Sequence, residues 1–154
     1  MSNITVTENQ NTVHQDNYLW IYDANDLGWV VDQSVILENI SFKIKQGEFV
    51  GFVGPNGAGK SSLLRCLFGK NKITSGSLHY KNQPLNNYSR REIAQQVAVL
   101  VQEPPTQFDM SVFDLVSLGL IPHRGLFSFN SEQDKRTVNE AIEEVELSHK
   151  SLEA

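Results

Sequence analysis

Apolar and polar positions are distributed unevenly along the chain. Residues 1–17 are polar, rich in Asn and Thr, and show no sustained periodicity. We expect a polar tail or a loosely held edge there, with little function of its own. From Tyr18 onward the apolar density rises, and residues 40–44 alternate between apolar and polar side chains. This alternation predicts a strand with one buried face.

A short apolar run over residues 49–53 comes next. Such a run is typical of a strand that is covered on both faces in a parallel sheet. The run ends at Gly54, and residues 61–68 then predict a helix that Gly69 is placed to end. The apolar residues expected on the inner side of this helix are Leu63, Leu64, Leu67 and Phe68.

Strand and helix patterns continue after this helix. Residues 77–81 predict another short strand. Ser89 and Glu92 have the spacing of a capping box, which would begin a short helix over residues 89–95. Residues 97–101 are five apolar residues in a row and predict a second buried strand.

The last third of the chain predicts helices. Residues 110–120 favour a helix that Pro122 ends. Ser131 and Asp134 can cap a final helix. Its apolar side chains recur with helical spacing at Val138, Ala141, Ile142 and Val145. The order of strands and helices predicts an α/β fold.

Composition narrows the class of protein. A chain of 154 residues with 40% apolar residues has room for one modest core, and therefore for one domain at most. The net charge of −5 and the absence of a Lys or Arg cluster argue against nucleic acid as a partner. The single cysteine, Cys66, excludes an internal disulfide and a multi-cysteine metal site. No apolar run approaches the roughly 20 residues that cross a bilayer, so we expect neither a membrane span nor an export signal.

The glycine-rich segment after the first predicted buried strand is the part of the sequence that indicates a binding function. It fits the pattern G-x-x-x-x-G-K-[ST] and lies between a predicted strand and a predicted helix, as that pattern requires. A loop that wraps phosphate turns successive backbone N–H groups inward, which favours residues without Cβ. The helix N-terminus adds free donors and about half a positive charge. The residues expected to bind phosphate are Gly54, Pro55, Asn56, Gly57, Ala58, Gly59, Lys60, Ser61 and Ser62.

Two side chains in this segment extend the prediction to a nucleoside triphosphate with Mg²⁺. Lys60 would reach the β- and γ-phosphates as a point charge. The hydroxyl of Ser61 would ligate a Mg²⁺ that bridges these phosphates, and Ser62 would add a hydrogen bond. Phosphate binding is common to kinases, GTPases, motor ATPases and transporter ATPases, so the loop alone leaves these classes open.

The wider sequence resembles one of these classes. Residues 54–65 look like the Walker A segment of ATP-binding cassette (ABC) ATPases, and residues 36–42 resemble that family's antiparallel edge. Gln102 lies 42 residues after Lys60, where the family has its Q-loop glutamine. Residues 111–123 are similar to the stretch after the Q-loop in ATPases of iron-siderophore, haem and vitamin B12 importers. The resemblance covers nearly everything from Leu27 onward.

The resemblance implies a fold and a domain plan. It implies a P-loop NTPase (RecA-like) core with an antiparallel β edge up to about residue 108, and the start of a helical subdomain from about residue 109. Both would belong to one ABC ATPase domain over residues 18–154, of which this chain would be the N-terminal portion. The core sheet would be incomplete, because the strands that the family places after its signature are missing from the sequence.

The resemblance also implies cofactors, partners and a location. ATP and Mg²⁺ would be bound, with Gln102 touching Mg²⁺ or the attacking water. The segment after Gln102 would contact a membrane permease, and a second ATPase subunit would complete a dimer around ATP. Such a subunit would be cytoplasmic and peripheral on the inner face of the cell membrane, and it would couple ATP binding and hydrolysis to uptake.

The sequence departs from the family in several places. The family stacks adenine on an aromatic residue near the position of Val31, which cannot stack; Trp29 would substitute, or would instead pack in the core. The signature, the Walker B strand with its carboxylates and the switch histidine are absent. We therefore expect this chain alone to bind MgATP weakly and not to hydrolyse it. A fragment of a longer subunit is the favoured explanation; a partner or an independent fold that covers the core is the other.

Two other classes of protein remain open. A P-loop kinase would need a lid of basic residues, for which the segment after Gln102 offers only Arg124. A non-transport ABC ATPase would use the same loop. Other titratable residues predict no site: Glu143, Glu144 and Glu146 are expected on a solvated helix face. We expect the four histidines at the surface and Cys66 as a small buried apolar residue, the histidines being His14, His79, His123 and His149.

Overall fold

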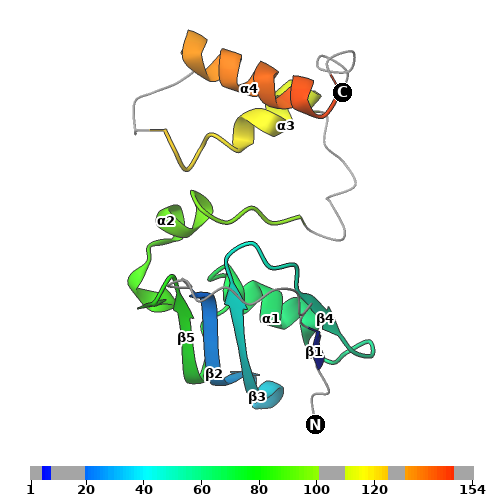
Figure 1. The fold of residues 1–154 in the computed structure, drawn as a ribbon, viewed down its shortest axis with the longest axis vertical. Helices are drawn as coiled ribbons and strands as arrows, with labels where there is room; N and C mark the ends of the chain where they lie inside the picture. The colour runs from blue at the N-terminus through cyan, green and yellow to red at the C-terminus, as the bar shows by residue number, and fades with distance from the viewer. Residues whose placement is uncertain (1–4, 8–19, 101–109, 125–130, 148–154) are drawn as a thin grey trace. The chain divides into compact units, whose positions relative to one another are not determined.

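The computed structural model describes residues 5–7, 20–100, 110–124 and 131–147. The chain divides into two compact units, Met1–Ile93 and Ala94–Ala154. Figure 1 labels most of the helices and strands of both units. Each unit is described by itself below.

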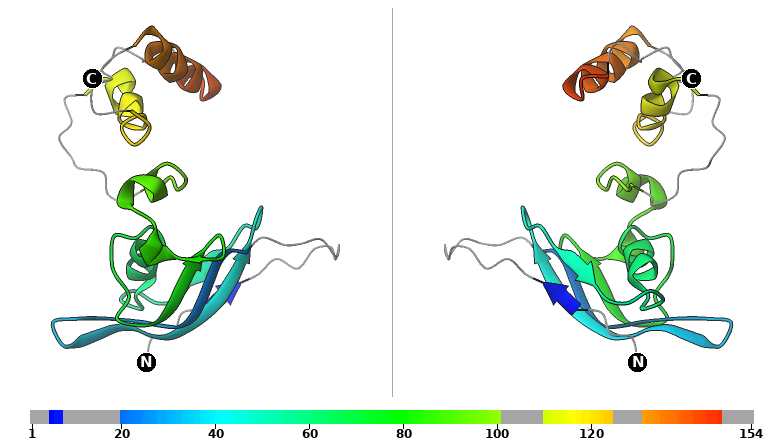
Figure 2. Two further views of the ribbon diagram at one scale, coloured as in Figure 1. Left: turned by 90° about the vertical axis from the view of Figure 1, so that its left-hand side faces the viewer. Right: turned by 90° about the vertical axis from the view of Figure 1, so that its right-hand side faces the viewer.

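A four-stranded antiparallel sheet forms the body of the first unit. Its strands are β2 (Trp20–Val31), β3 (Ser34–Lys45), β5 (Ser75–Tyr80) and β6 (Gln83–Pro84), in the order β3-β2-β5-β6. The long hairpin of β2 and β3 turns at Asp32 and Gln33, whose φ angles of 46° and 65° fit a two-residue turn with both central residues in the left-handed region. This sheet is the antiparallel edge that the sequence resemblance implied. Figure 2 shows it from two sides.

Two irregularities in the long hairpin change which side chains face the core. Asp26 has a φ of 47° in β2, and Asn39 has a φ of 53° in β3. The pairing register shifts between Ala24 and Leu27, and both of these side chains are buried. The bulged strands therefore bury residues three positions apart on one face. The alternation predicted for residues 40–44 is confirmed beyond the second bulge, where Ile40 and Phe42 are buried and Ser41 and Lys43 are exposed.

Helix α1 (Lys60–Leu67) covers one face of this sheet (Figure 2). Leu63 and Cys66 are fully buried, at 0% exposure. The hydroxyl of Tyr22 in β2 donates a hydrogen bond to the Leu67 carbonyl at 3.1 Å, which ties the last turn of the helix to the sheet. The predicted helix is confirmed within one residue at each end, and Gly69 follows its last residues with a φ of 73°. Leu64, which we expected on the inner side, is 47% exposed.

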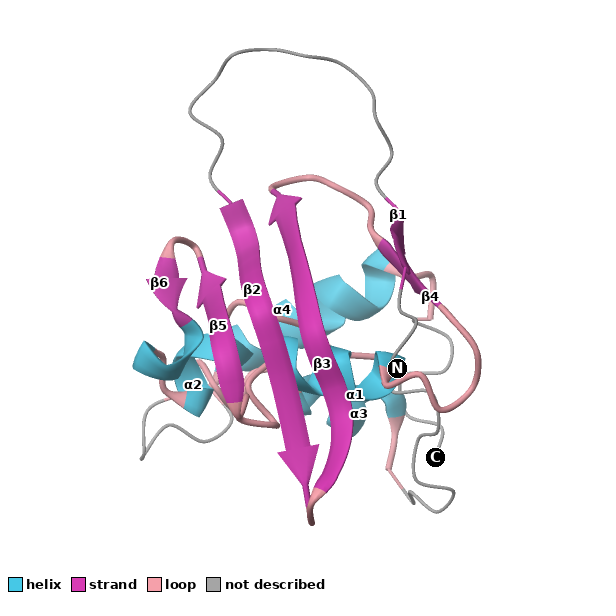
Figure 3. Cartoon of the chain, turned by 90° about the horizontal axis from the view of Figure 1, so that it is seen from below, coloured by secondary structure: helices cyan, strands magenta, loops and turns pink. Residues whose placement is uncertain are grey.

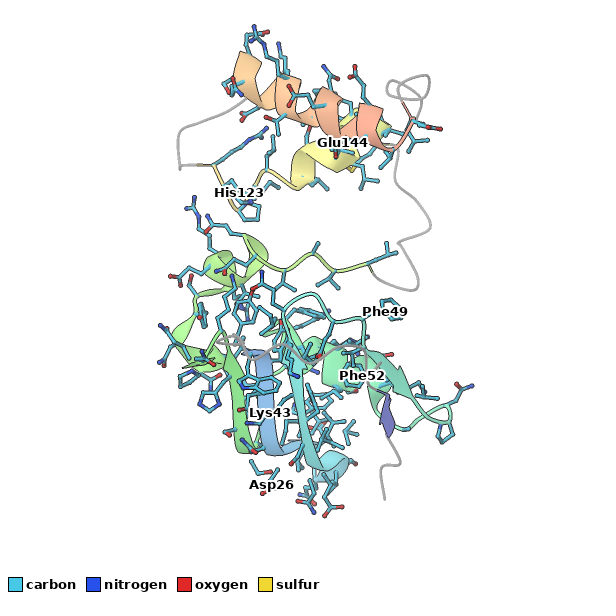
Figure 4. All side chains as sticks on the ribbon, viewed as in Figure 1. Asp26, Lys43, Phe49, Phe52, His123 and Glu144 are labelled. Atoms are coloured by element: carbon cyan, nitrogen blue, oxygen red, sulfur yellow. The ribbon has the colours of Figure 1, made fainter. Side chains whose placement is uncertain are left out.

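The strand that precedes the glycine-rich loop is shorter and less covered than predicted. Strand β4 (Gly51–Val53) pairs antiparallel with β1 (Thr5–Thr7), and Figure 3 shows this pair beside the larger sheet. Strand β1 thus lies within the expected polar tail. The prediction of a parallel strand covered on both faces is wrong for this structure, because Val53 is 57% exposed and Phe49, just before the strand, is 90% exposed (Figure 4).

The second predicted buried strand is also wrong for the residues that can be described. Residues 97–100 form no strand, and Leu100 is 100% exposed. The physical reason is the same in both cases. An apolar run has the capacity for burial on two faces, but burial requires neighbouring strands and covering helices, which the described residues do not supply. Val101, the last residue of the predicted strand, lies outside the described residues.

The predicted capping box of the short helix after Ser89 is confirmed. Helix α2 (Arg90–Ala94) begins after Ser89, whose hydroxyl accepts from the Glu92 N–H at 3.2 Å while the Glu92 carboxylate accepts from the Ser89 N–H at 2.7 Å. These two hydrogen bonds form the predicted capping box. They also lower the pKa of the exposed Glu92 carboxyl. A 3-10 turn, η1 (Leu85–Asn87), connects β6 to this helix.

The second unit contains a pair of packed helices. Helix α3 (Val112–Leu118) is shorter than predicted and is capped by the Ser111 hydroxyl. Helix α4 (Glu132–Glu144) begins with a capping box between Ser131 and Asp134, as predicted. The core of this unit includes two side chains of α4 that are almost completely buried, Val138 at 2% and Ile142 at 1% exposure. Ala141 and Val145, also expected on the apolar side of this helix, are exposed.

Within the described part of the chain, no helix is both long enough and apolar enough to cross a membrane.

Candidate nucleotide-binding site

The glycine-rich loop connects β4 to α1 in the first unit. Gly57 has a φ of 80° and Gly59 a φ of 89°, both in the left-handed region that residues with a Cβ rarely adopt. Gly54 is not one of the described residues with a positive φ. The prediction that the loop needs backbone conformations favoured by glycine is therefore confirmed at Gly57 and Gly59.

Strand β3 lies so close to Gly59 that it leaves no space for a side chain there. A Cβ added at this residue would lie 2.8 Å from Cδ2 of Leu37 and 2.9 Å from the Ile36 carbonyl oxygen. Both distances are shorter than normal contacts between such atoms. By contrast, a Cβ added at Gly57 would meet nothing within 4 Å. The start of α1 is thus pressed against the sheet, and only glycine fits there.

Lys60 lies over the loop that precedes it. Its Nζ donates to the carbonyls of Gly54 and Pro55, both at 2.7 Å. The Ala58 N–H donates to the Pro55 carbonyl at 3.2 Å and closes a turn within the loop. The ammonium charge is therefore held at the mouth of the loop, where it can interact with an anion.

The N-terminus of α1 is open to an anion. The helix starts at Lys60, and its first backbone hydrogen bond runs from the Leu63 N–H to the Gly59 carbonyl at 2.8 Å. No side chain caps this end, and its first turn contains no acidic residue. The N–H groups of the first turn and the positive end of the helix dipole are thus available to an anion beside Lys60.

The remaining predicted residues of the loop differ in exposure. Pro55, Asn56 and Ser61 are exposed, Ser62 is partly exposed, and Ala58 is buried. An exposed hydroxyl at Ser61 suits the role of a metal ligand. Gln102, the second expected metal ligand, lies outside the described residues.

Trp29 lies in β2, opposite Leu37 of β3 in the strand register. Its side chain is partly exposed, and Val31 is 42% exposed. Since Leu37 also backs Gly59, Trp29 and the loop adjoin the same residue of β3. Sequence reasoning did not single out this contact. The glycine pattern predicts that another part of the backbone lies close to Gly59. Because the bulge at Asn39 shifts the register of β3, the sequence does not predict which residue of β3 lies there.

Other candidate groups behave as expected where they are described. Glu143, Glu144 and Glu146 are exposed, although Glu146 follows the end of α4. Figure 4 labels Glu144. His123 is exposed and His79 is partly exposed; His14 and His149 lie outside the described residues. Burial raises the pKa of the Cys66 thiol to about 11, as suits a packed apolar residue. No group of three or more His, Cys, Asp or Glu side chains with metal-binding geometry occurs in the described ranges.

Comparison with known proteins agrees with this geometry. The family model described as ABC transporter matches residues 37–154. The chain is 39% identical to a hemin import ATP-binding protein of Rhodopseudomonas palustris over 63% of its length, and 30% identical to the iron(3+)-hydroxamate import ATP-binding protein of Bacillus subtilis over 85%. It is 32% identical to the ferric enterobactin transport ATP-binding protein of Escherichia coli over 74%. The chain spans 37% of the length of the hemin relative, 50% of the iron(3+)-hydroxamate relative and 42% of the ferric enterobactin relative.

Solved structures give the same fold. A nucleotide-free ATP-binding cassette from an ABC transporter matches 87% of this chain with a TM-score of 0.71 at 22% identity, and the match covers 57% of that structure's chain. The cbiO1 protein of Clostridium perfringens, part of an ABC transporter complex, matches 87% of this chain with a TM-score of 0.68 at 26% identity, over 53% of its own chain.

Proposed function

This chain belongs to the ABC transporter family, and we propose that it supplies the ATP-binding region of an importer's ATPase subunit. The proposed cargo is an iron-siderophore, haem or cobalamin-type compound. The observation that carries the proposal is the loop of residues 54–61. Its ammonium group and the uncapped start of α1 adjoin, as phosphate binding requires.

The proposed ATP contacts are made by the loop and by β2. Residues 54–62 bind the phosphates through backbone N–H groups and Lys60. Trp29 stacks on the adenine; its register position opposite Leu37, the residue behind Gly59, supports this role. Ser61 and Gln102 are the proposed Mg²⁺ ligands. When bound, Mg²⁺ neutralises charge on the β- and γ-phosphates.

The proposed partners follow from the relatives. They are named as ATP-binding proteins for hemin, ferric enterobactin and iron-hydroxamate import. We therefore propose that the segment after Gln102 contacts a membrane permease on the cytoplasmic face. A second ATPase subunit would complete the ATP site.

The chain by itself is proposed to bind MgATP without turning it over. Its sequence contains no signature motif, no Walker B run of apolar residues ending in a pair of carboxylates, and no switch histidine. A general base contributes about 10²–10⁴-fold to such a reaction. Purified protein with steady ATPase activity that is lost in Lys60→Ala would contradict this part of the proposal.

Transport in the cell that makes the protein tests the function. Lys60→Ala would be introduced into its gene, with Lys135→Ala as the matched control. Lys135 is an exposed cation of α4, whose ion pair with Glu132 at 2.8 Å is of little energetic consequence at the surface. Uptake of radiolabelled ferric siderophores, hemin and cobalamin is then measured.

The proposal predicts that Lys60→Ala abolishes uptake of one of these three classes and that Lys135→Ala leaves it intact. Unchanged uptake of all three classes in Lys60→Ala cells, with nucleotide binding demonstrably lost, would refute the transport role. Phosphoryl transfer from ATP to a small acceptor by the purified protein would favour the kinase alternative instead.

A further inference from the structure

Strand β2 is irregular where Trp29 lies. The pairing register with β3 shifts on both sides of this residue, between Leu27 and Trp29 and again between Trp29 and Val30. On the other edge of β2, pairing with β5 ends one residue earlier, at Gly28 opposite Ser75. A regular strand ladder therefore does not continue through Trp29, and something else must fix the backbone there.

Thr74 binds β2 on both sides of Trp29. It lies in the connection between α1 and β5, directly before β5 begins at Ser75. The Thr74 N–H donates to the Gly28 carbonyl at 2.8 Å, and the Thr74 hydroxyl donates to the same carbonyl at 3.2 Å. The hydroxyl oxygen also accepts from the Val30 N–H at 3.1 Å. Three hydrogen bonds thus hold the residues before and after Trp29.

These hydrogen bonds matter because the end of β2 has little other support. The Trp29 side chain is partly exposed, and the next two residues, Val30 and Val31, are 39% and 42% exposed. The Thr74 hydroxyl supplies a donor and an acceptor, as the backbone of a neighbouring strand would. Because the allowed side-chain rotamers depend on the backbone angles, fixing the backbone at Trp29 also restricts the direction of its ring.

The direction of the Trp29 ring bears on the proposed ATP site. On the edge opposite Thr74, Trp29 pairs with Leu37, the residue that lies against Gly59 of the phosphate loop. Stacking requires a defined ring geometry, and a binding residue keeps that geometry only when its supporting contacts hold it. A base whose phosphates are bound by the loop would therefore stack well on Trp29 only in one orientation of the ring.

We propose that Thr74 is a positioning residue for nucleotide binding. Through its hydrogen bonds to Gly28 and Val30, it holds Trp29 in the orientation that stacks on adenine. This inference rests on the proposed ATP binding and on the stacking role of Trp29. The competing explanation is that Thr74 only holds the start of β5, a role that would affect stability without distinguishing ATP from a ligand that lacks the base.

Binding of MgATP and of magnesium tripolyphosphate to the whole purified chain, measured by titration calorimetry, tests the proposal. Tripolyphosphate offers the phosphates without a base. Thr74→Val removes the hydroxyl with little change in shape, whereas Thr74→Ser keeps the hydroxyl. Thr137→Val is the matched control, because it removes an exposed threonine hydroxyl of α4 that donates to the Gln133 carbonyl at 3.1 Å.

The two ligands should respond differently to these changes. Thr74→Val should weaken MgATP binding at least about threefold and change tripolyphosphate binding by less than about twofold. Thr74→Ser and Thr137→Val should bind both ligands as the original chain does. Unchanged MgATP binding in Thr74→Val, or equal weakening of both ligands, would overturn the proposal. A loss in Thr74→Ser as large as in Thr74→Val would assign the effect to the methyl group and overturn it as well.

Trp29→Ala separates this inference from the proposed function. It should weaken MgATP binding at least about tenfold and leave tripolyphosphate binding unchanged. Trp29→Ala/Thr74→Val should bind MgATP no more weakly than Trp29→Ala, because Thr74 acts only through Trp29.

Each failure has a different meaning. An original chain that does not bind MgATP would refute the proposed function, and this inference with it. Undiminished MgATP binding by Trp29→Ala would refute the stacking role and the role of Thr74, but not phosphate binding by the loop. Additive losses in the double variant would refute the role of Thr74 alone.

Hydrogen exchange of the Val30 amide tests the same link without a substitution. Coupling between two contacts is reciprocal, so a stacked adenine should favour the hydrogen bond from the Val30 N–H to the Thr74 hydroxyl. MgATP should therefore slow exchange of this amide, and magnesium tripolyphosphate should not. Equal exchange in the two complexes would contradict the proposal, even if Thr74→Val failed to fold.

Discussion

Replacing Gly59 by alanine is expected to destabilise the first unit far more than replacing Gly57, although the two glycines have nearly the same φ. Alanine in the left-handed region costs about 1–2 kcal/mol at either residue. At Gly57 nothing else opposes the added methyl group. At Gly59 the methyl group would meet Cδ2 of Leu37 at 2.8 Å and the Ile36 carbonyl oxygen at 2.9 Å. Forcing this contact should add about 1–3 kcal/mol, because a backbone carbonyl cannot rotate away as a side chain can.

Urea denaturation followed by tryptophan fluorescence measures this difference. The only two tryptophans of the chain, Trp20 and Trp29, lie in β2, so the signal reports on the unit that contains the loop. With a slope of about 1–3 kcal/mol per M urea, the midpoint of Gly59→Ala should lie about 1 M below that of Gly57→Ala. Equal midpoints would show that β3 does not constrain the start of α1, and would refute the reasoning.

Three further predictions concern contacts away from the loop. Tyr22→Phe should lower the free energy of unfolding by about 1–2 kcal/mol, because the buried Leu67 carbonyl loses its donor. Burial, with a smaller effect of Tyr80, raises the pKa of Tyr22 from 10.0 to about 12, so its neutral form stabilises the folded state. This contribution to the free energy of unfolding should be complete below about pH 10 and disappear as the pH rises towards 12. Denaturation measured at several pH values should therefore show a smaller loss of stability with rising pH in Tyr22→Phe than in the original chain. Ser131→Ala should cost about 1 kcal/mol by removing the capping box of α4; unchanged hydrogen exchange of the Asp134 amide would count against this. Cys66, buried and with a pKa raised to about 11, should react with a thiol reagent only as fast as the chain opens, and rapid labelling of the folded protein would contradict its burial.

Features set by neighbouring residues could be predicted from the sequence. The capping boxes at Ser89 and Ser131 require only two side chains three residues apart, and both form with the expected partners. The start of α1 and the positive φ of Gly57 and Gly59 likewise follow from the local pattern. The conformation of the glycine-rich loop is predictable for this reason, since consecutive residues determine it.

Features that depend on distant partners could not be predicted. The bulges at Asp26 and Asn39 shift the buried face of β2 and β3, and neither residue type signals a bulge by itself. The exposure of Phe49 and Leu100 reflects which strands are available to cover them, which a single apolar run does not specify.

The proposed function depends most on the binding of nucleotide phosphates by the loop before α1. Two-dimensional NMR of the ¹⁵N-labelled chain, titrated with MgATP, tests it directly. We expect saturable shifts of the backbone amides of residues 57–62, and their loss in Lys60→Ala. Amides that remain unmoved at saturating MgATP, or shifts that are the same in Lys60→Ala, would contradict the central claim.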